Sequence, residues 1–152
     1  MDYTNYNIIK ILPNIYILKN PINNIDNVLS NLNIKYLINV NNSIITNNYI
    51  TLNININSNL EFIDSTELYN IDFTISNDFI CAALQNNFNM IICDNNFSIS
   101  FLLIGAFILK YLNLTYTETI HWLYTKLNIK NMSKNTINQL YLYFVEQTKS
   151  DN

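Results

Sequence analysis

The sequence predicts an α/β fold with a helical C-terminal half. Short apolar stretches rich in β-branched residues recur up to Cys93, and stretches whose apolar residues have helical spacing lie between them. After Ser98 only helical patterns follow. Strands that first alternate with helices and then give way to helices are typical of a sheet covered by helices.

Five stretches are predicted to be strands. Pro13-Asn14 separates the first two as a tight turn. Ile50–Ile56 alternates strictly between apolar and polar residues, which indicates a strand with one face in the core. The predicted strands are Ile8–Leu12, Ile15–Leu18, Tyr36–Val40, Ile50–Ile56 and Asn89–Cys93.

Five stretches are predicted to be helices. Ser98 is a candidate N-cap, and Thr115 with Glu118 forms a capping-box pattern. The predicted helices are Asn24–Leu32, Tyr69–Leu84, Ser98–Leu112, a helix from Thr115 to about Leu127, and Lys134–Glu146. The polar segment Asn57–Leu68 is expected to be a loop.

Length and composition favour one domain over residues 1–152, since 49% of the residues are hydrophobic and can form a sizeable core. The formal net charge is −3, all eight basic residues are lysines, and no basic patch for nucleic acid is evident. The longest apolar run, Phe101–Leu109, is far shorter than the ~20 residues that span a bilayer. We therefore expect a soluble cytoplasmic protein with neither a nucleic-acid nor a membrane partner.

The many asparagines indicate coding bias from an A/T-rich genome, because Arg, Gly and Pro are correspondingly scarce. A disordered, prion-like chain is the rival interpretation. It fits less well, because the asparagines alternate with periodic apolar residues.

Cys93 is predicted to end a buried strand, with a polar loop and a long apolar helix after it. Loop amides at the start of a helix form a nest for an anion, and such a site would lower the pKa of the thiol. A cysteine at a strand end is also commonly a small buried apolar residue. The residues alone leave both interpretations open.

The order and spacing of these segments resemble the small dual-specificity protein phosphatases of the cysteine-dependent tyrosine phosphatase superfamily. The resemblance covers nearly the whole chain and implies a single domain with a central, mostly parallel sheet flanked by helices. The segments that carry it are Ile11–Ile17, Leu32–Val40, Asp78–Leu84, Gly105–Thr115 and Gln139-Leu140, placed around Cys93.

The family's signature is a His-Cys pair, five residues and an Arg, usually followed by Ser or Thr. In such enzymes the Cys attacks phosphorus, the loop amides hold phosphate oxygens, and the Arg clamps them. Here Cys93 matches the nucleophile and Ser100 the final hydroxyl residue. The His, Gly and Arg positions hold Ile92, Asn96 and Ile99, and the remaining loop residues are Asp94, Asn95, Phe97 and Ser98.

Two further departures concern charge. Asp94 adds a negative charge where a phosphate dianion would bind. The family's general acid is an Asp after the strand that here is Ile50–Ile56, and that position falls on Asn57 or Ser58. Asp64 is the nearest carboxylate and would serve only if the loop were rebuilt.

The resemblance with these departures implies a catalytically inactive pseudophosphatase that acts as a binding or structural module for a protein partner, without metal or cofactor. One alternative is a weakly active phosphatase that uses Cys93. Another is a module that binds phosphorylated ligands through the loop amides, Ser98 and Ser100 without hydrolysing them.

Size, composition and family together suggest a poxvirus-type protein, located in the host cytoplasm or the virion. The poxvirus enzymes that it resembles dimerise through an N-terminal helix, whereas here the first strand already begins near Ile8. A homodimer would therefore use another surface.

Overall fold

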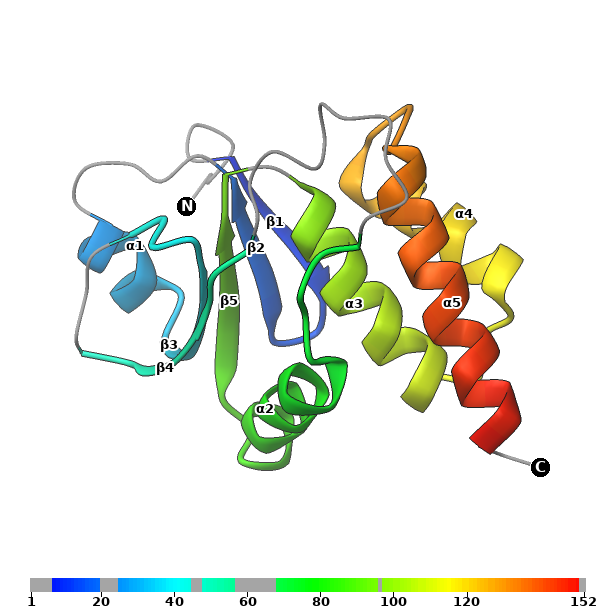
Figure 1. Cartoon of the computed structure of the whole chain (residues 1–152). Helices are drawn as coiled ribbons and strands as arrows, with labels where there is room; N and C mark the ends of the chain where they lie inside the picture. The colour runs from blue at the N-terminus through cyan, green and yellow to red at the C-terminus, as the bar shows by residue number, and fades with distance from the viewer. Residues whose placement is uncertain (1–6, 20–24, 45–47, 57–67, 96, 151–152) are drawn as a thin grey trace. The chain divides into compact units, whose positions relative to one another are not determined.

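The computed structural model describes residues 7–19, 25–44, 48–56, 68–95 and 97–150 (Figure 1). The strands in this part of the chain are β1 (Ile8–Leu12), β2 (Ile15–Lys19), β3 (Ile34–Val40), β4 (Ile50–Ile54) and β5 (Asn89–Asp94). The helices are α1 (Ile25–Asn31), α2 (Phe73–Gln85), α3 (Phe97–Tyr111), α4 (Tyr116–Leu127) and α5 (Lys134–Ser150).

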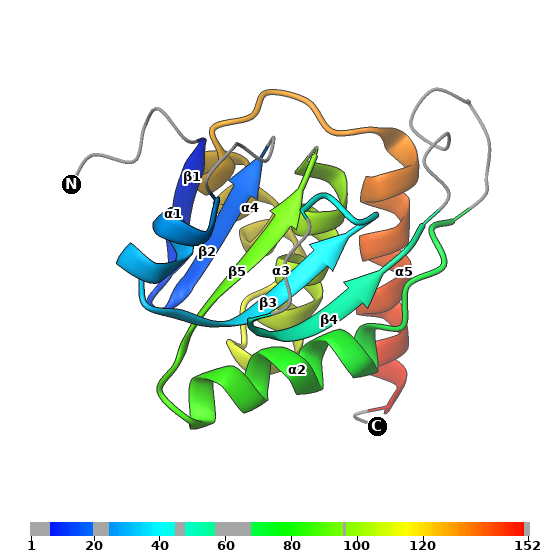
Figure 2. The same cartoon turned by 90° about the vertical axis from the view of Figure 1, so that its left-hand side faces the viewer.

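The strands form one sheet in the order β1-β2-β5-β3-β4 (Figure 2). β1 pairs antiparallel with β2, and every other neighbouring pair is parallel. The predicted α/β fold with a mostly parallel sheet and a helical C-terminal half is therefore confirmed. The expectation of a single domain over residues 1–152 remains a prediction.

The chain divides into two compact units, which we describe separately. The first unit comprises Met1–Asn55 and Thr74–Phe97, and it holds the sheet, α1 and nearly all of α2. The second comprises Ile56–Phe73 and Ser98–Asn152, and it holds α4, α5 and all of α3 except its first residue.

In the first unit α1 and α2 cover opposite faces of the sheet. Leu37 of β3 packs in an apolar cluster with Val28 and Leu29 of α1. Tyr36, the preceding residue, stacks edge-on against Phe79 of α2, with 5.3 Å between the ring centroids. Because successive strand residues point to opposite faces, these two contacts assign one helix to each face.

In the second unit the three helices approach closely at Gly105 of α3, the only glycine in the chain. A Cβ atom at this position would lie 2.8 Å from the Leu140 side chain of α5 and 3.2 Å from that of Leu123 of α4. α3 is buried along nearly its whole length from Ser98 to Ile108. A helix that is apolar all round is expected in such an interior position.

The start of α4 follows the sequence prediction closely. The Thr115 side chain accepts a hydrogen bond from the Glu118 amide at 3.1 Å, and the Glu118 carboxylate accepts one from the Thr115 amide at 3.4 Å. The predicted capping box is therefore confirmed.

Other boundaries differ from the prediction. α2 begins at Phe73 rather than Tyr69, whose amide instead donates to the Gln139 side chain of α5 at 2.8 Å. α3 begins at Phe97, so Ser98 lies inside the helix and is not its N-cap. β4 ends at Ile54 rather than Ile56, and most of the predicted loop Asn57–Leu68 lies outside the described residues.

Asparagine takes the left-handed backbone positions in this chain. Every described residue with a positive φ is an Asn: Asn7, Asn14, Asn33, Asn41, Asn42, Asn87, Asn113 and Asn128. Asn tolerates this region better than other residues with a side chain, because its short polar group bonds locally. The asparagines attributed to coding bias thus occupy turn and cap positions that glycine fills in most proteins.

Candidate functional site

Cys93 lies on the central strand of the sheet, at its carboxyl end. β5 is parallel to β2 on one side and to β3 on the other, and Cys93 is in register with Leu18 and Asn39. Asp94 ends the strand in register with Lys19. The carboxyl end of a central parallel strand is where open α/β sheets place their ligand sites.

The Cys93 side chain belongs to the core of the first unit. Its exposed fraction is 0%, and it is part of the apolar cluster beneath α1. That cluster comprises Leu18, Ile25, Val28, Leu29, Leu32, Ile34, Leu37, Ile44, Ile91 and Cys93. This placement agrees with the interpretation of Cys93 as a small buried apolar residue.

The electrostatics of the site are opposite to those of a thiolate cradle. Burial, and after it the charge of Asp94, raises the pKa of the Cys93 thiol from its ordinary value of 9.0 to about 12. Asp94 is itself 2% exposed. Both causes act against the lowering of this pKa that a nest of loop amides and a helix dipole would produce, and of the two interpretations left open they favour the buried apolar cysteine.

The residues that the family resemblance matches to signature positions are buried where the structure describes them. Ile92 is 0% exposed, Ile99 1% and Ser100 0%. Ile99 lies in the first turn of α3, and its side chain offers no hydrogen-bond donor to an anion. The Ser98 hydroxyl is paired with the Met132 sulfur at 3.6 Å, within the second unit.

The other predicted loop residues are partly accessible. Asn95 is exposed at a bend between β5 and α3, and Phe97 is half-buried. Asn96 and the candidate acid Asp64 lie outside the described residues, as do Asn57 and Ser58.

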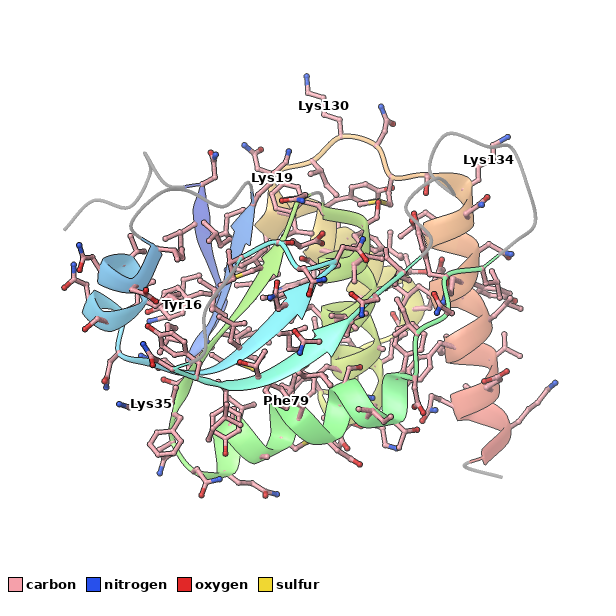
Figure 3. All side chains as sticks on the ribbon, turned by 60° about the vertical axis from the view of Figure 1, so that its left-hand side comes forward. Tyr16, Lys19, Lys35, Phe79, Lys130 and Lys134 are labelled. Carbon is pink, nitrogen blue, oxygen red and sulfur yellow. The ribbon has the colours of Figure 1, made fainter. Side chains whose placement is uncertain are left out.

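Sequence reasoning missed Lys19. Its ammonium lies 4.7 Å from the centroid of the Phe97 ring, which places a cation–π contact beside the loop (Figure 3). A lysine that directly follows an apolar strand was the available signal, but its proximity to the loop depends on the pairing of β2 with β5.

Sequence reasoning also missed Asn39. Its side-chain amide donates to the Ile44 carbonyl at 2.8 Å, and its side-chain oxygen accepts from the Ile44 amide at 3.3 Å. This buried pair closes the turn after β3 and holds Ile44 in the cluster that contains Cys93. The signal was a single polar residue inside the apolar run Tyr36–Val40.

The described part of the chain contains neither a metal-binding cluster of side chains nor a helix that could span a membrane. No group of three or more His, Cys, Asp or Glu residues among residues 7–150 as described is placed to hold a metal ion. None of the described helices combines the length and apolar character needed to cross a membrane.

No protein-family model matches the sequence, and no curated protein matches it significantly. Solved structures do match. The human tyrosine phosphatase-like serine/threonine/tyrosine-interacting protein is 19% identical, with a TM-score of 0.77 over 93% of this chain and 97% of that one.

Two further solved structures agree with this match. A leucine rich repeat and phosphatase domain containing protein from Entamoeba histolytica is 16% identical, with a TM-score of 0.76 over 99% of both chains. DUSP15 is 20% identical, with a TM-score of 0.72 over 94% of this chain and 90% of that one. The chain therefore has the fold of the dual-specificity phosphatases.

Proposed function

We propose that this protein is a pseudophosphatase, a dual-specificity phosphatase fold without phosphatase activity that serves as a binding or structural module for a protein partner. The observation that carries the proposal is the state of Cys93. A thiol with a pKa of about 12 and no exposed surface is protonated at neutral pH and inaccessible to a phosphate ester. Only a thiolate is a competent nucleophile for phosphoryl transfer.

The absence of arginine supports the same conclusion. Ile99 occupies the signature Arg position, and the sequence has no arginine that could act in its place. Guanidinium contacts to the charge of a phosphoryl transition state are worth ~10³-fold or more in rate. Asp94 adds a buried carboxylate next to Cys93, which disfavours a second negative charge at that end of β5.

A binding role is consistent with the retained framework. The buried cluster around Cys93 and the Asn39–Ile44 pair preserve the sheet end although the catalytic groups are replaced. One solved structure with this fold is a human protein named as phosphatase-like and serine/threonine/tyrosine-interacting. We infer that the present chain likewise uses the fold for interaction with another protein.

Steady-state hydrolysis of an aryl phosphate tests this function. We expect the wild-type protein and Cys93→Ser to show the same background rate, with Cys81→Ser as a control for the other cysteine. Turnover that disappears only in Cys93→Ser would overturn the proposal in favour of a weakly active phosphatase. Heat released on titration with a phosphotyrosine peptide, without turnover, would favour a phospho-ligand-binding module.

We also propose a viral source of poxvirus type, with the protein in the host cytoplasm or the virion. The support is compositional: Asn and Ile are abundant, whereas Arg is absent and Gly occurs once. Sequencing of the flanking genes tests this origin, and cellular rather than viral neighbours would contradict it.

A further inference from the structure

The two edges of the sheet differ in how they are protected. Edge strands expose unpaired backbone groups, and proteins commonly protect them with charges, Pro or bulges. β1 has the exposed Lys10, a pairing irregularity between Lys10 and Leu12, and Pro13 directly after it. β4 pairs regularly with β3 and has the sequence Ile-Thr-Leu-Asn-Ile, without charge, Pro or Gly.

One hydrogen bond shows which backbone groups of β4 point away from β3. The Asn41 amide, which follows β3, donates to the Ile54 carbonyl at 2.7 Å, so this carbonyl points toward β3. Because peptide groups alternate along a strand, the N–H and C=O groups of Thr51 and Asn53 point away from β3. Among the described residues, no backbone hydrogen bond joins β4 to a segment other than β3 and Asn41.

We propose that β4 pairs with β4 of a second copy of this chain, antiparallel and about a two-fold axis at Leu52. In this register Ile50 faces Ile54 of the other copy, and Thr51 faces Asn53. Every apolar residue then meets an apolar residue and every polar residue a polar one, because the order of polarity in Ile-Thr-Leu-Asn-Ile is the same in both directions.

The backbone groups fit this register. Thr51 and Asn53 are the residues with outward N–H and C=O groups, so each Thr51–Asn53 pair can exchange two hydrogen bonds. A shift by one residue would place Ile or Leu side chains opposite Thr or Asn and turn them to the other face. Among the registers in which backbone and side chains agree, the one with its axis at Leu52 pairs all five residues of β4.

The exposure of apolar side chains on and near β4 supports a second copy of the chain as the partner of this edge. Ile50, Leu52 and Ile54 are in register with Tyr36, Ile38 and Val40. They therefore lie on the face covered by α2. Ile50 is 53% exposed, as is Ile75 of α2. Pairing with an identical strand would continue this apolar row across the axis and bring no like charges together.

Variants of Thr51 and Asn53, whose backbone groups point away from β3, test the proposed dimer. The measurement is sedimentation velocity over a range of protein concentrations. We expect the wild-type protein to form a concentration-dependent dimer. Asn53→Lys adds a charge to the edge, and Thr51→Pro removes an N–H that does not serve the β3 ladder, so both should sediment as monomers.

Two matched controls should remain dimeric. Thr51→Val keeps the N–H and loses the same hydroxyl as the proline variant. Gln85→Lys adds the same charge at an exposed position of α2, away from the edge. Circular dichroism melts would verify that all variants fold. A wild-type protein that is monomeric at every concentration, or a dimer that Asn53→Lys leaves intact, would overturn the proposal.

Cross-linking tests the register itself, in a Cys81→Ser background. Position 52 is the only one of β4 that faces itself, in a non-hydrogen-bonded pair whose Cα atoms approach to ~4.5 Å. Leu52→Cys should therefore form an intermolecular disulfide under mild oxidation, whereas Ile50→Cys and Asn53→Cys should not. Equal cross-linking at all three positions would exclude this register.

Discussion

Cys93 and Asp94 are neighbours in sequence at the carboxyl end of β5, and both side chains are buried. Burial first, and the charge of Asp94 second, raise the pKa of the Cys93 thiol to about 12. In an enzyme that uses a thiolate the surroundings must act in the opposite direction. The two residues thus favour a neutral thiol at the position that the resemblance matches to a phosphatase nucleophile.

The raised pKa predicts a loss of stability at alkaline pH. An unfolded thiol releases its proton near its ordinary value of 9.0, before the folded one does so at about 12. The stabilisation by the protonated thiol is therefore complete below about pH 9 and is lost as the pH rises toward about 12. In this window the free energy of unfolding falls by an amount that approaches ~1.4 kcal/mol per pH unit.

Urea denaturation between neutral pH and pH ~10 measures this slope, which develops above the ordinary thiol pKa. The comparison is between the wild type and Cys93→Ala, so that the contributions of all other groups cancel. The alanine variant should be less stable at pH 7 because of the lost packing, but should lose stability less steeply above pH ~9. If the unfolding free energies of the wild type and Cys93→Ala fell in parallel with pH, the raised pKa of Cys93 would be contradicted.

Asn39 is predicted to stabilise the sheet end next to Cys93. Asn39→Ala leaves the buried amide and carbonyl of Ile44 without their partners, which costs about 1–3 kcal/mol of folding free energy. Asn39→Asp keeps the acceptor and, at a pH where its carboxyl is protonated, also an O–H donor, so its cost from lost hydrogen bonds should be smaller there than that of Asn39→Ala. Equal stability of Asn39→Ala and the wild type in urea would contradict this role.

Gly105 is predicted to be coupled to Leu140. Alanine in place of glycine favours a helix by ~1 kcal/mol, but its Cβ would lie 2.8 Å from the Leu140 side chain. When Gly105→Ala is made in the wild-type protein, the gain in helix propensity and the clash with Leu140 oppose each other. In a Leu140→Ala background only the 3.2 Å approach to Leu123 remains, so Gly105→Ala should stabilise there, by up to ~1 kcal/mol. A double-mutant cycle by thermal or urea unfolding measures the difference, and additivity would show that the contact is without consequence.

Asn14 tests the role of asparagine at left-handed positions. It has a φ of 70° in the turn between β1 and β2, and its carbonyl accepts from the Met90 amide at 2.8 Å. Asn14→Ala should destabilise by ~1 kcal/mol, whereas Asn14→Gly should be nearly neutral. The control Asn138→Ala, at an exposed position of α5, should be neutral or stabilising. Equal effects of Ala at positions 14 and 138 would contradict the assignment.

Periodicity predicted most of the fold because burial dominates these elements. Ile8–Leu12 matched β1 throughout, and the capping box at Thr115 marked the start of α4 to the residue. The start of α2 was missed because Tyr69 is apolar and buried, yet its backbone bonds to Gln139 of α5. A long-range contact of this kind has no local signature.

The place of Cys93 near the end of a strand was predicted, whereas its surroundings were predicted only in part. The sequence placed Cys93 at a strand end, but the direction of its pKa shift depends on α1 and on the strands beside it. Lys19 of β2 and Asn39 of β3 lie beside β5 because the strand order is β2-β5-β3. A single sequence does not reveal this order. The asparagines at left-handed turns were not predicted either, because asparagine is so abundant in the sequence that these positions do not stand out.

Alkylation of Cys93 as a function of pH distinguishes a buried neutral thiol from a reactive thiolate. In a Cys81→Ser protein, folded Cys93 should remain unlabelled by iodoacetamide at pH ~6–8, well below its raised pKa, whereas the urea-unfolded protein labels readily. Asp94→Asn removes the lesser cause of the raised pKa, so it should leave the labelling slow. Rapid labelling of the folded wild-type thiol at pH ~6 would identify a reactive thiolate and contradict the account.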